Sequence, residues 1–211
     1  MDKSFVYYHN NQEYVVNITY KRIKNIHYRF KDGAFEVSCP RLVTIGKIKS
    51  GLDRFAESLI KRSTKKAPEG DNYIYLLGNK ITLTYPGCLF FLNERITYET
   101  KEQLHRKLKK VFLSYLINRT REYEKIMKAP SYQIKIRDMK TRYGSNNRPK
   151  KIITYAFMLI YHPQDVIDSV VMHELTHCFV YDHSDKFYRL LYKYCPNYDI
   201  LRKRLIKAVF D

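Results

Sequence analysis

The sequence predicts an α+β fold with a β-rich amino-terminal half and a carboxy-terminal half of helices around a small sheet. Three observations support this fold class. Short β-branched and aromatic stretches dominate the chain up to residue 98, a helical hydrophobic period runs through 101–128, and a second buried helical pattern follows Pro163. With 211 residues and 45% hydrophobic content, the chain can bury a sizeable core in one domain or two small ones.

The first elements are strands followed by one helix. Residues 13–40 contain stretches typical of strands, and the turn signal Asp32-Gly33 predicts a hairpin between HYRF and AFEV. Thr44 stands where it can cap a helix. The apolar residues of 48–60 recur at spacings of three and four, so this helix should present one apolar stripe.

A second strand pair, YIYLLGNKITLTY, is broken at Gly78-Asn79 and completes the expected amino-terminal region, 1–98. The carboxy-terminal region, 99–211, then begins with the long helix at 101–128, although the two regions can also form one continuous unit. This helix should stop before Pro130. Its expected inward residues are Leu104, Leu108, Val111, Phe112, Tyr115, Leu116 and Ile126.

The remaining elements alternate between strand and helix. SYQIKIRDM at 131–139 alternates like a half-buried strand, and TRYGSNNRPKK is expected to be a basic loop that pivots at Gly144. KIITYAFMLIY at 151–161 is expected to be a buried strand. A helix over 163–179 should pack against the long helix beside these strands, and a last helix follows, capped by Ser184.

Composition excludes several classes of protein. Lys and Arg outnumber Asp and Glu by 39 to 21, a formal net charge of +18, but no nucleic-acid-binding motif accompanies this charge. The longest apolar run is about half the roughly 20 residues of a membrane-spanning helix, and the start MDKSFVYYHN lacks an apolar signal segment. We therefore expect a cytoplasmic protein without membrane association. Four cysteines without a CxxC pair argue against a cysteine-based zinc ribbon.

The strongest chemical signal is the HExxH motif formed by residues 173–177, within the helix expected after Pro163. Four residues turn a helix by about 400°, so His173 and His177 project from one face and can bind one metal ion. Glu174 lies about 100° round from His173, where its carboxylate can take a proton from a metal-bound water. The motif thus predicts metal ligands at His173 and His177 and a catalytic base at Glu174.

A catalytic zinc ion usually has three protein ligands and one open position, and His183 is the candidate for the third ligand. In a continuous helix His183 would point about 120° away from His177, so the helix must break between Phe179 and Asp182. Three neutral imidazoles favour zinc, and we expect one ion per chain. The other histidines lack such a context and are expected to be ordinary core or surface residues: His9, His27, His105 and His162.

The carboxy-terminal half contains IRDMKTRYGS (136–145), the strand before the HExxH helix, VVMHELTH (170–177), DHS (182–184), the aromatic Phe187 and CPNYDILRKRL (195–205). Together these features resemble the YgjP-like (DUF45) metal-dependent hydrolase family, a metallopeptidase-like family related to the SprT and WLM zinc proteases. A weaker match extends upstream through YKRIKNIHYRFKDGAFEVSCPRLVT and YLLGNKITL. The resemblance implies a compact zincin-like half with an active-site helix, a back helix and a small sheet.

The resemblance also places the loop with Arg142, Tyr143 and Ser145 beside the substrate, where the Arg142 guanidinium could bind a carboxylate, a phosphate or a developing oxyanion. Tyr143 or Asp182 could support the metal ligands from outside. The chain departs from the family at three places that border the substrate. Tyr-Gly-Ser-Asn at 143–146 replaces Trp-Gly-Ser-Cys, Ala156 replaces a common Asn, and Asp182 replaces the Asn before the third His.

These features predict metal-assisted hydrolysis, in which zinc polarises the scissile group and acidifies its water while Glu174 moves the proton. The preferred hypothesis is that the protein is a zinc metallopeptidase that cleaves peptide bonds. The alternatives are hydrolysis of nucleotides or other phosphorylated small molecules, and a basic nucleic-acid-associated protein like the SprT relatives. Metzincins share the ligand spacing, but Val180 stands where they need Gly. The sequence carries no signal of oligomeric state.

Overall fold

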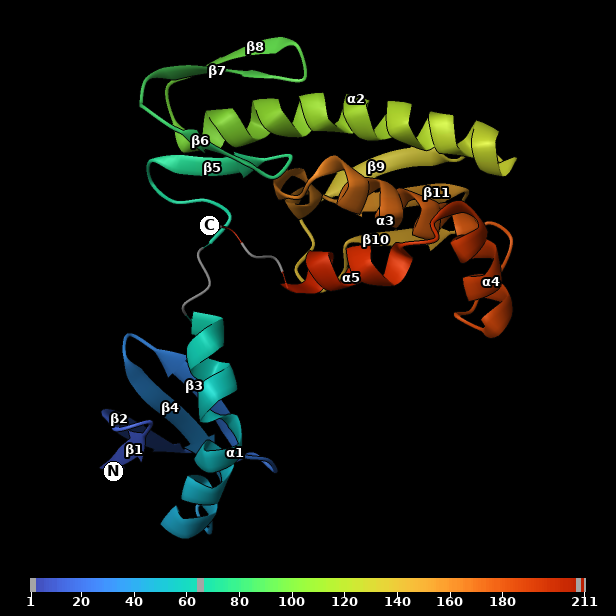
Figure 1. Ribbon diagram of the computed structural model, residues 1–211. Coiled ribbons are helices and arrows are strands. Elements are labelled where there is room, and N and C mark those ends of the chain that lie inside the picture. The colour runs from blue at the N-terminus through green and yellow to red at the C-terminus, as the bar shows by residue number, and fades with distance from the viewer. Residues whose placement is uncertain (1–2, 64–66, 208–209, 211) are drawn as a thin grey trace. The chain divides into compact units, whose positions relative to one another are not determined.

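The computed structural model describes residues 3–63, 67–207 and 210 (Figure 1). The chain divides into two compact units, Met1–Lys66 and Ala67–Asp211. This division differs from the boundary expected between residues 98 and 99. The strands after residue 67 group with the second unit because their apolar side chains, including Ile74, Leu89 and Ile96, join its core.

The amino-terminal unit is a four-stranded sheet with one helix. Its strand order is β1-β2-β4-β3, with β2 and β4 parallel and the other pairs antiparallel. The hairpin expected at Asp32-Gly33 is confirmed, since both residues have positive φ (49° and 79°) in the turn between β3 and β4. Strand β1 was not predicted from the sequence. The elements are β1 (Lys3–His9), β2 (Gln12–Tyr20), β3 (His27–Lys31), β4 (Ala34–Cys39) and α1 (Ile45–Ser63).

A separate core holds this unit together. The helix begins as expected, because Thr44 Oγ1 accepts a hydrogen bond from the backbone N–H of Lys47 at 3.3 Å. Alternate strand residues and one stripe of α1 are fully shielded from solvent. This core comprises Tyr7, Val16, Ile18, Phe35, Val37, Cys39, Ile48, Leu52 and Ala56.

The carboxy-terminal unit begins with two hairpins. The expected pair is confirmed as β5 (Tyr73–Leu76) with β6 (Asn79–Thr82). The second hairpin, β7 (Gly87–Phe91) with β8 (Glu94–Tyr98), was not predicted. Its turn is Leu92-Asn93, both with positive φ (50° and 65°), so it lacks the glycine that usually signals such a turn.

The long helix α2 (Lys101–Met127) is confirmed. Thr100 caps its start by accepting a hydrogen bond from Gln103 N at 3.3 Å, and Lys128 ends it in the left-handed conformation. The expected inward position of Ile126 is wrong, because its side chain is 59% exposed while Met127 is buried. The buried stripe ends with Leu116, Thr120, Glu124 and Met127, which leaves Ile126 on the outer side.

The second unit contains a three-stranded sheet in the order β10-β11-β9, with β10 antiparallel and β9 parallel to β11. Two expectations are corrected here. The region around Gly144 is the edge strand β10 (Gly144–Asn147) rather than a loop, and the expected strand 151–161 ends early. It consists of β11 (Ile152–Ala156) followed by a 3₁₀ helix, η1 (Phe157–Tyr161), because a continuous apolar run does not distinguish a strand from a buried helical turn. The third strand is β9 (Gln133–Arg137).

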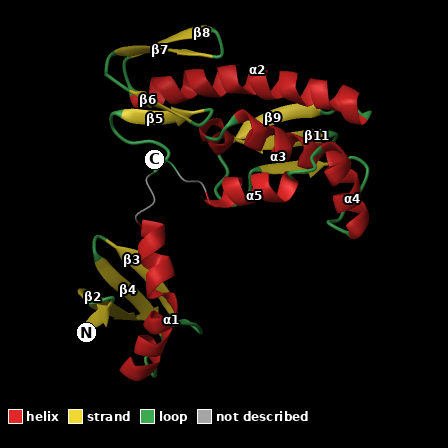
Figure 2. Ribbon diagram, viewed as in Figure 1, coloured by secondary structure: helices red, strands yellow, loops and turns green. Residues whose placement is uncertain are grey.

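Helix α3 (Gln164–Thr176) lies between α2 and α5 (Tyr198–Lys207) and contacts both of them and β10 (Figure 2). Helix α4 (Asp185–Tyr194) follows the expected Ser184 boundary, whereas α5 was not predicted as a helix. Arg119 of α2 fixes the orientation of α3 through a largely buried ion pair, with its Nε 2.9 Å from Asp168 Oδ1. None of the described helices has the length and apolar character needed to cross a membrane.

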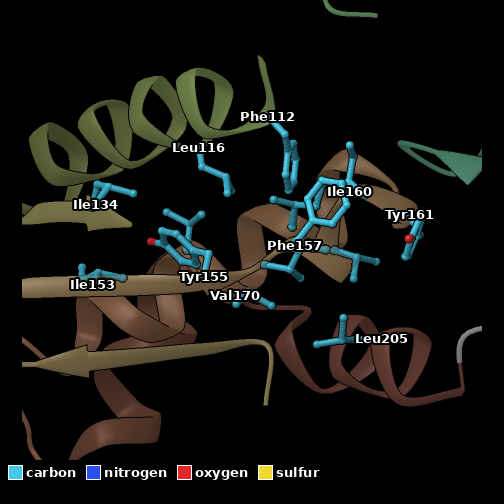
Figure 3. Packing of buried hydrophobic residues seen from close by; sticks show 14 of the residues in the cluster. Phe112, Leu116, Ile134, Ile153, Tyr155, Phe157, Ile160, Tyr161, Val170 and Leu205 are labelled. Atoms are coloured by element: carbon cyan, nitrogen blue, oxygen red, sulfur yellow. The ribbon is translucent and has the colours of Figure 1, made fainter. Parts of the chain in front are cut away.

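The core of the second unit fills the space between α2, the three-stranded sheet and α3. In Figure 3, Phe112 and Leu116 point inward from α2, with Tyr155 of β11 below Leu116 and Val170 of α3 beyond it. Tyr155 is fully buried, and its hydroxyl lies 3.2 Å from Thr120 Oγ1. This packing holds the carboxy-terminal end of α3 against β10, where the histidines of the HExxH motif lie.

Candidate metal centre

The end of helix α3 positions the HExxH motif. His173 and Glu174 lie in its last turn, and His177 is the C-cap residue. The chain then leaves the helix in a tight turn at 178–180, where Cys178 N donates to Leu175 O at 2.9 Å. The helical path therefore ends well before residue 183.

The turn after α3 brings His183 back toward the motif. Its Nε2 lies 3.1 Å from Nε2 of His173. One ring nitrogen from each of His173, His177 and His183 lies within 4.8 Å of the other two. The buried ring of Phe187 packs beneath all three, with centroid distances of 5.0, 4.6 and 4.8 Å to them in that order. Three imidazoles thus converge on one point above an apolar floor.

Two of these imidazoles form a hydrogen bond through Nδ1, the ring nitrogen that faces away from the cluster. Nδ1 of His177 lies 3.2 Å from the carbonyl oxygen of Val180, and Nδ1 of His173 lies 2.8 Å from the hydroxyl of Tyr198. Such contacts set both the ring orientation and the tautomer of a histidine. In each ring the second nitrogen is left facing the other imidazoles.

The side chains expected to support the histidines form other bonds. Asp182 Oδ1 accepts a hydrogen bond from Ser184 Oγ at 3.0 Å, and the hydroxyl of Tyr143 donates to Leu205 O at 3.2 Å. Asp182 is exposed. In the structure, the Val180 carbonyl and Tyr198 therefore occupy the supporting positions that sequence analysis expected Asp182 or Tyr143 to fill.

Burial favours the neutral form of two of the rings, those of His173 and His177. It lowers the pKa of His173 to about 3, with smaller contributions from the neighbouring His177 and His183. Burial also lowers the pKa of His177. A metal ion binds the lone pair of a neutral imidazole, so this environment matches the protonation state that a ligand needs.

Glu174 points toward β10 and is 5% exposed. Burial raises the pKa of its carboxyl to about 8, partly offset by the charge of Arg142. Its Oε2 is buried without a hydrogen-bond partner among the described residues. A side chain at Gly144 would put its Cβ 2.4 Å from Glu174 Oε1, so glycine is required for this packing, and Asn146 Nδ2 donates to the backbone oxygen of Glu174 at 2.7 Å.

A cleft of about 710 Å³ lies over these groups. Arg142, Tyr143 and Ser145, the residues expected beside the substrate, all line it together with Glu174 and the three histidines. Two further arginines, Arg148 and Arg202, also line the cleft and were not predicted as site residues. Glu174 is the only carboxylate among the described lining residues, so the cleft walls carry positive charge.

Asn146 and Tyr198 contact the motif but were not predicted as site residues. Asn146 was noted only as a departure from the family pattern, although a polar side chain on an edge strand beside α3 is placed to bond that helix. Tyr198 begins the helix that was not predicted. The spacing of Tyr198, Leu201 and Leu205 is helical, and this pattern could have identified α5.

The remaining histidines lie apart from the cluster. His105 Nε2 is 2.7 Å from Glu69 Oε2, and His162 is buried between the rings of Tyr143 and Phe210. Within residues 3–63, 67–207 and 210, the cluster at 173, 177 and 183 is the one group of three or more His, Cys, Asp or Glu side chains close enough to bind a single ion.

Comparisons with known proteins identify the family. The sequence model of the YgjP-like metallopeptidase domain matches residues 24–208, while no curated protein matches the chain. Similar solved structures include the abylysin metallopeptidase zymogen of Pyrococcus abyssi, with 17% identity, a TM-score of 0.42, and coverage of 44% of this chain and 93% of that one. The jannalysin zymogen of Methanocaldococcus jannaschii has 19% identity, a TM-score of 0.40, and coverage of 44% and 95%.

The family match spans most of the chain, from β3 of the amino-terminal unit to α5, and includes the histidine cluster, Glu174 and β10. The resemblance inferred from the HExxH, DHS and CPNYDILRKRL segments is thereby confirmed. The chain belongs to the YgjP-like metallopeptidase domain family and is a metallopeptidase-like, metal-dependent hydrolase.

Proposed function

We propose that the protein is a zinc peptidase in which His173, His177 and His183 bind one zinc ion per chain and Glu174 is the general base. The observation that carries this proposal is the convergence of three imidazole nitrogens within 4.8 Å beside a buried carboxylate. All four groups line one cleft. Peptides are the proposed substrates because the family is one of metallopeptidases.

The donor set fits a zinc ion. Nε2 of His173 and Nε2 of His183 face each other at 3.1 Å, and Oε2 of Glu174 is a buried oxygen without a partner among the described residues. Three nitrogen donors suit zinc better than magnesium or calcium, which prefer oxygen. A bound zinc ion would act as a Lewis acid that polarises a carbonyl group and lowers the pKa of the water bound to it.

Glu174 then moves the proton. Beside a bound zinc ion, the positive charge would favour the ionised form of its carboxyl, which can then accept a proton from the attacking water and return it to the leaving amine. The hydrogen bond from Asn146 to its backbone and the space above Gly144 hold the side chain in place. Around it, Arg142 offers a cation for a substrate carboxylate or oxyanion, and Ser145 offers a hydroxyl from the edge strand. Tyr143 forms an aromatic part of the cleft wall.

A second candidate function is hydrolysis of a nucleotide or another phosphorylated small molecule. The observation in its favour is the charge of the cleft, where Arg142, Arg148 and Arg202 stand against the single carboxylate of Glu174. Guanidinium groups bind phosphate with paired hydrogen bonds. The same metal and base would serve, but the scissile bond would be a phosphoanhydride or a phosphate ester.

One assay separates the two candidates. Zinc-loaded wild type and Glu174→Gln are incubated with a library of internally quenched peptides and, separately, with nucleoside triphosphates. Peptide cleavage by wild type that is lost in Glu174→Gln supports the peptidase. Phosphate release that depends on Glu174, without peptide cleavage, overturns the peptidase in favour of the second candidate. Peptide cleavage that is equal in both proteins overturns the role of Glu174.

A further inference from the structure

We propose that Tyr198 is a positioning residue for the metal site, whose hydroxyl oxygen accepts a hydrogen bond from Nδ1–H of His173 and thereby directs Nε2 of that ring toward His177 and His183. The inference rests on the proposed function, because it takes His173 as a metal ligand. It assigns a role to the CPNYDILRKRL segment, which the metal ligands and the base leave without one.

The contact is close and well supported. The Tyr198 hydroxyl lies 2.8 Å from His173 Nδ1, and the two rings are nearly parallel at 15° with their centroids 5.7 Å apart. Tyr198 is 6% exposed, so little water competes for the bond. Helix α5 is anchored elsewhere too, since Tyr143 Oη donates to Leu205 O and Arg204 forms an ion pair with Asp165 at the start of α3. The phenol is therefore presented by a fixed element.

The tautomer of His173 decides which partner donates. A neutral imidazole has one N–H and one lone pair, and only the nitrogen with the lone pair can bind a metal. Nε2 faces His183 at 3.1 Å, so the ligand-competent form of His173 carries its hydrogen on Nδ1. Tyr198 must then accept. If Tyr198 donated instead, the hydrogen would sit on Nε2 of His173 and would have to leave that nitrogen before the ring could bind a metal.

His177 provides an internal comparison. Its Nδ1 lies 3.2 Å from the carbonyl oxygen of Val180, which can only accept, so this contact selects the Nδ1–H tautomer. A hydroxyl can donate or accept, so the Tyr198 contact alone leaves both tautomers of His173 open. In the metal-free protein we expect His183 Nε2–H to donate to His173, which fixes His173 as Nδ1–H and Tyr198 as the acceptor.

The experiment measures Zn²⁺ affinity by competition with a chromophoric chelator. Tyr198→Phe removes the hydroxyl and keeps the ring, and we expect affinity to fall by about 10- to 100-fold, the usual effect of removing an outer hydrogen-bond partner of a metal ligand. Tyr192→Phe is the matched control, because it also removes one tyrosine hydroxyl. The Tyr192 hydroxyl, on α4, donates a hydrogen bond to Asp199 of α5 at 3.0 Å. Tyr192→Phe should bind Zn²⁺ like wild type.

A second measurement needs no variant. Long-range ¹H–¹⁵N correlation spectra of the metal-free wild type should show His173 as the Nδ1–H tautomer, and the Nε2–H tautomer would overturn the proposal. Wild-type affinity in Tyr198→Phe would overturn it as well. His173→Ala separates the two levels of inference. If His173→Ala binds Zn²⁺ with wild-type affinity, the ligand set of the proposed function is wrong. If His173→Ala loses Zn²⁺ binding while Tyr198→Phe keeps wild-type affinity, only the role of Tyr198 is wrong.

Discussion

Both compact units contain histidine and tyrosine residues, but only in the carboxy-terminal unit do the described histidines cluster. His27 of the amino-terminal unit is exposed on β3, and the residue paired with it on the neighbouring strand β4 is Ser38. In the carboxy-terminal unit, the end of α3, the turn after it and the start of α5 bring His173, His183 and Tyr198 into contact. The difference shows that a site depends on several elements converging, and that composition alone does not produce one.

The units also differ in how they use charged side chains. The ion pair between Glu57 and Lys61 in the amino-terminal unit is exposed and contributes little to stability. In the carboxy-terminal unit, Arg119 and Asp168 are largely buried and join α2 to α3. A buried pair of this kind fixes the relative position of two elements even where its net contribution to stability is small. The second unit thus uses polar contacts to position its site.

The largest expected effect is loss of the metal. Replacing His173, His177 and His183 together by Ala should reduce zinc content to background, because no imidazole of the cluster remains. His27→Ala in the amino-terminal unit is the control and should keep the wild-type zinc content. Elemental analysis of the purified proteins measures both. An equal zinc content in the triple variant and in wild type would mean that the metal binds elsewhere, and that the two units do not differ as described above.

The second effect separates catalysis from metal binding. Glu174→Gln keeps the size of the side chain but removes its basicity, so the hydrolytic rate should fall by about 10²- to 10⁴-fold. Zinc content should stay at the wild-type level, because Glu174 is assigned as a base and not as a ligand. Single-turnover rates and elemental analysis on the same preparation test this. A variant that lost its zinc would show that Glu174 binds or supports the metal.

Local patterns were sufficient to predict much of this organisation. The HExxH spacing places His173 and His177 on one helix face by geometry alone, and the long apolar stripe of α2 identifies that helix. The hairpin at Asp32-Gly33 follows from turn chemistry. These features depend only on residues that are close in sequence.

Several of the features that were missed depend on contacts between distant segments. Tyr198 lies 25 residues from His173, and its hydrogen bond exists only because α5 packs on α3. Gly144 was interpreted as a loop pivot, but it belongs to an edge strand that leaves room for Glu174. The apolar run before His162 gave no period that could separate β11 from the 3₁₀ helix η1. No local pattern contains such information.

The third prediction tests whether the units are energetically separate. Leu52 is fully buried in the core of the amino-terminal unit, so Leu52→Ala should destabilise that unit by about 2–5 kcal/mol. Zinc should raise only the unfolding transition of the other unit, since ligands stabilise the state that binds them. Calorimetry with and without zinc should show Leu52→Ala lowering the transition that zinc leaves unchanged. A single transition that responds to both would mean that the units unfold together.

The smallest effect concerns a buried histidine outside the metal cluster. His162 is 4% exposed, and burial lowers its pKa to about 4 from an ordinary value of 6.5. Above pH 6.5 the ring is neutral in both the folded and the unfolded protein, so it adds no pH dependence. Below pH 6.5 the unfolded chain binds a proton that the folded protein does not, and stability falls as pH falls toward 4. The difference of 6.5 − 4 = 2.5 pKa units corresponds to about 3 kcal/mol.

His162→Phe should remove this loss, because the phenyl ring packs against Tyr143 and Phe210 without titrating. Other charged groups line the same hollow, including Lys203 and Arg204 of α5, and they are common to both proteins. Urea unfolding of the metal-free proteins between pH 7 and 4.5 provides the comparison. The stability of wild type should decline more steeply with acid than that of His162→Phe, and parallel curves would show that His162 is protonated in the folded protein as readily as in the unfolded chain.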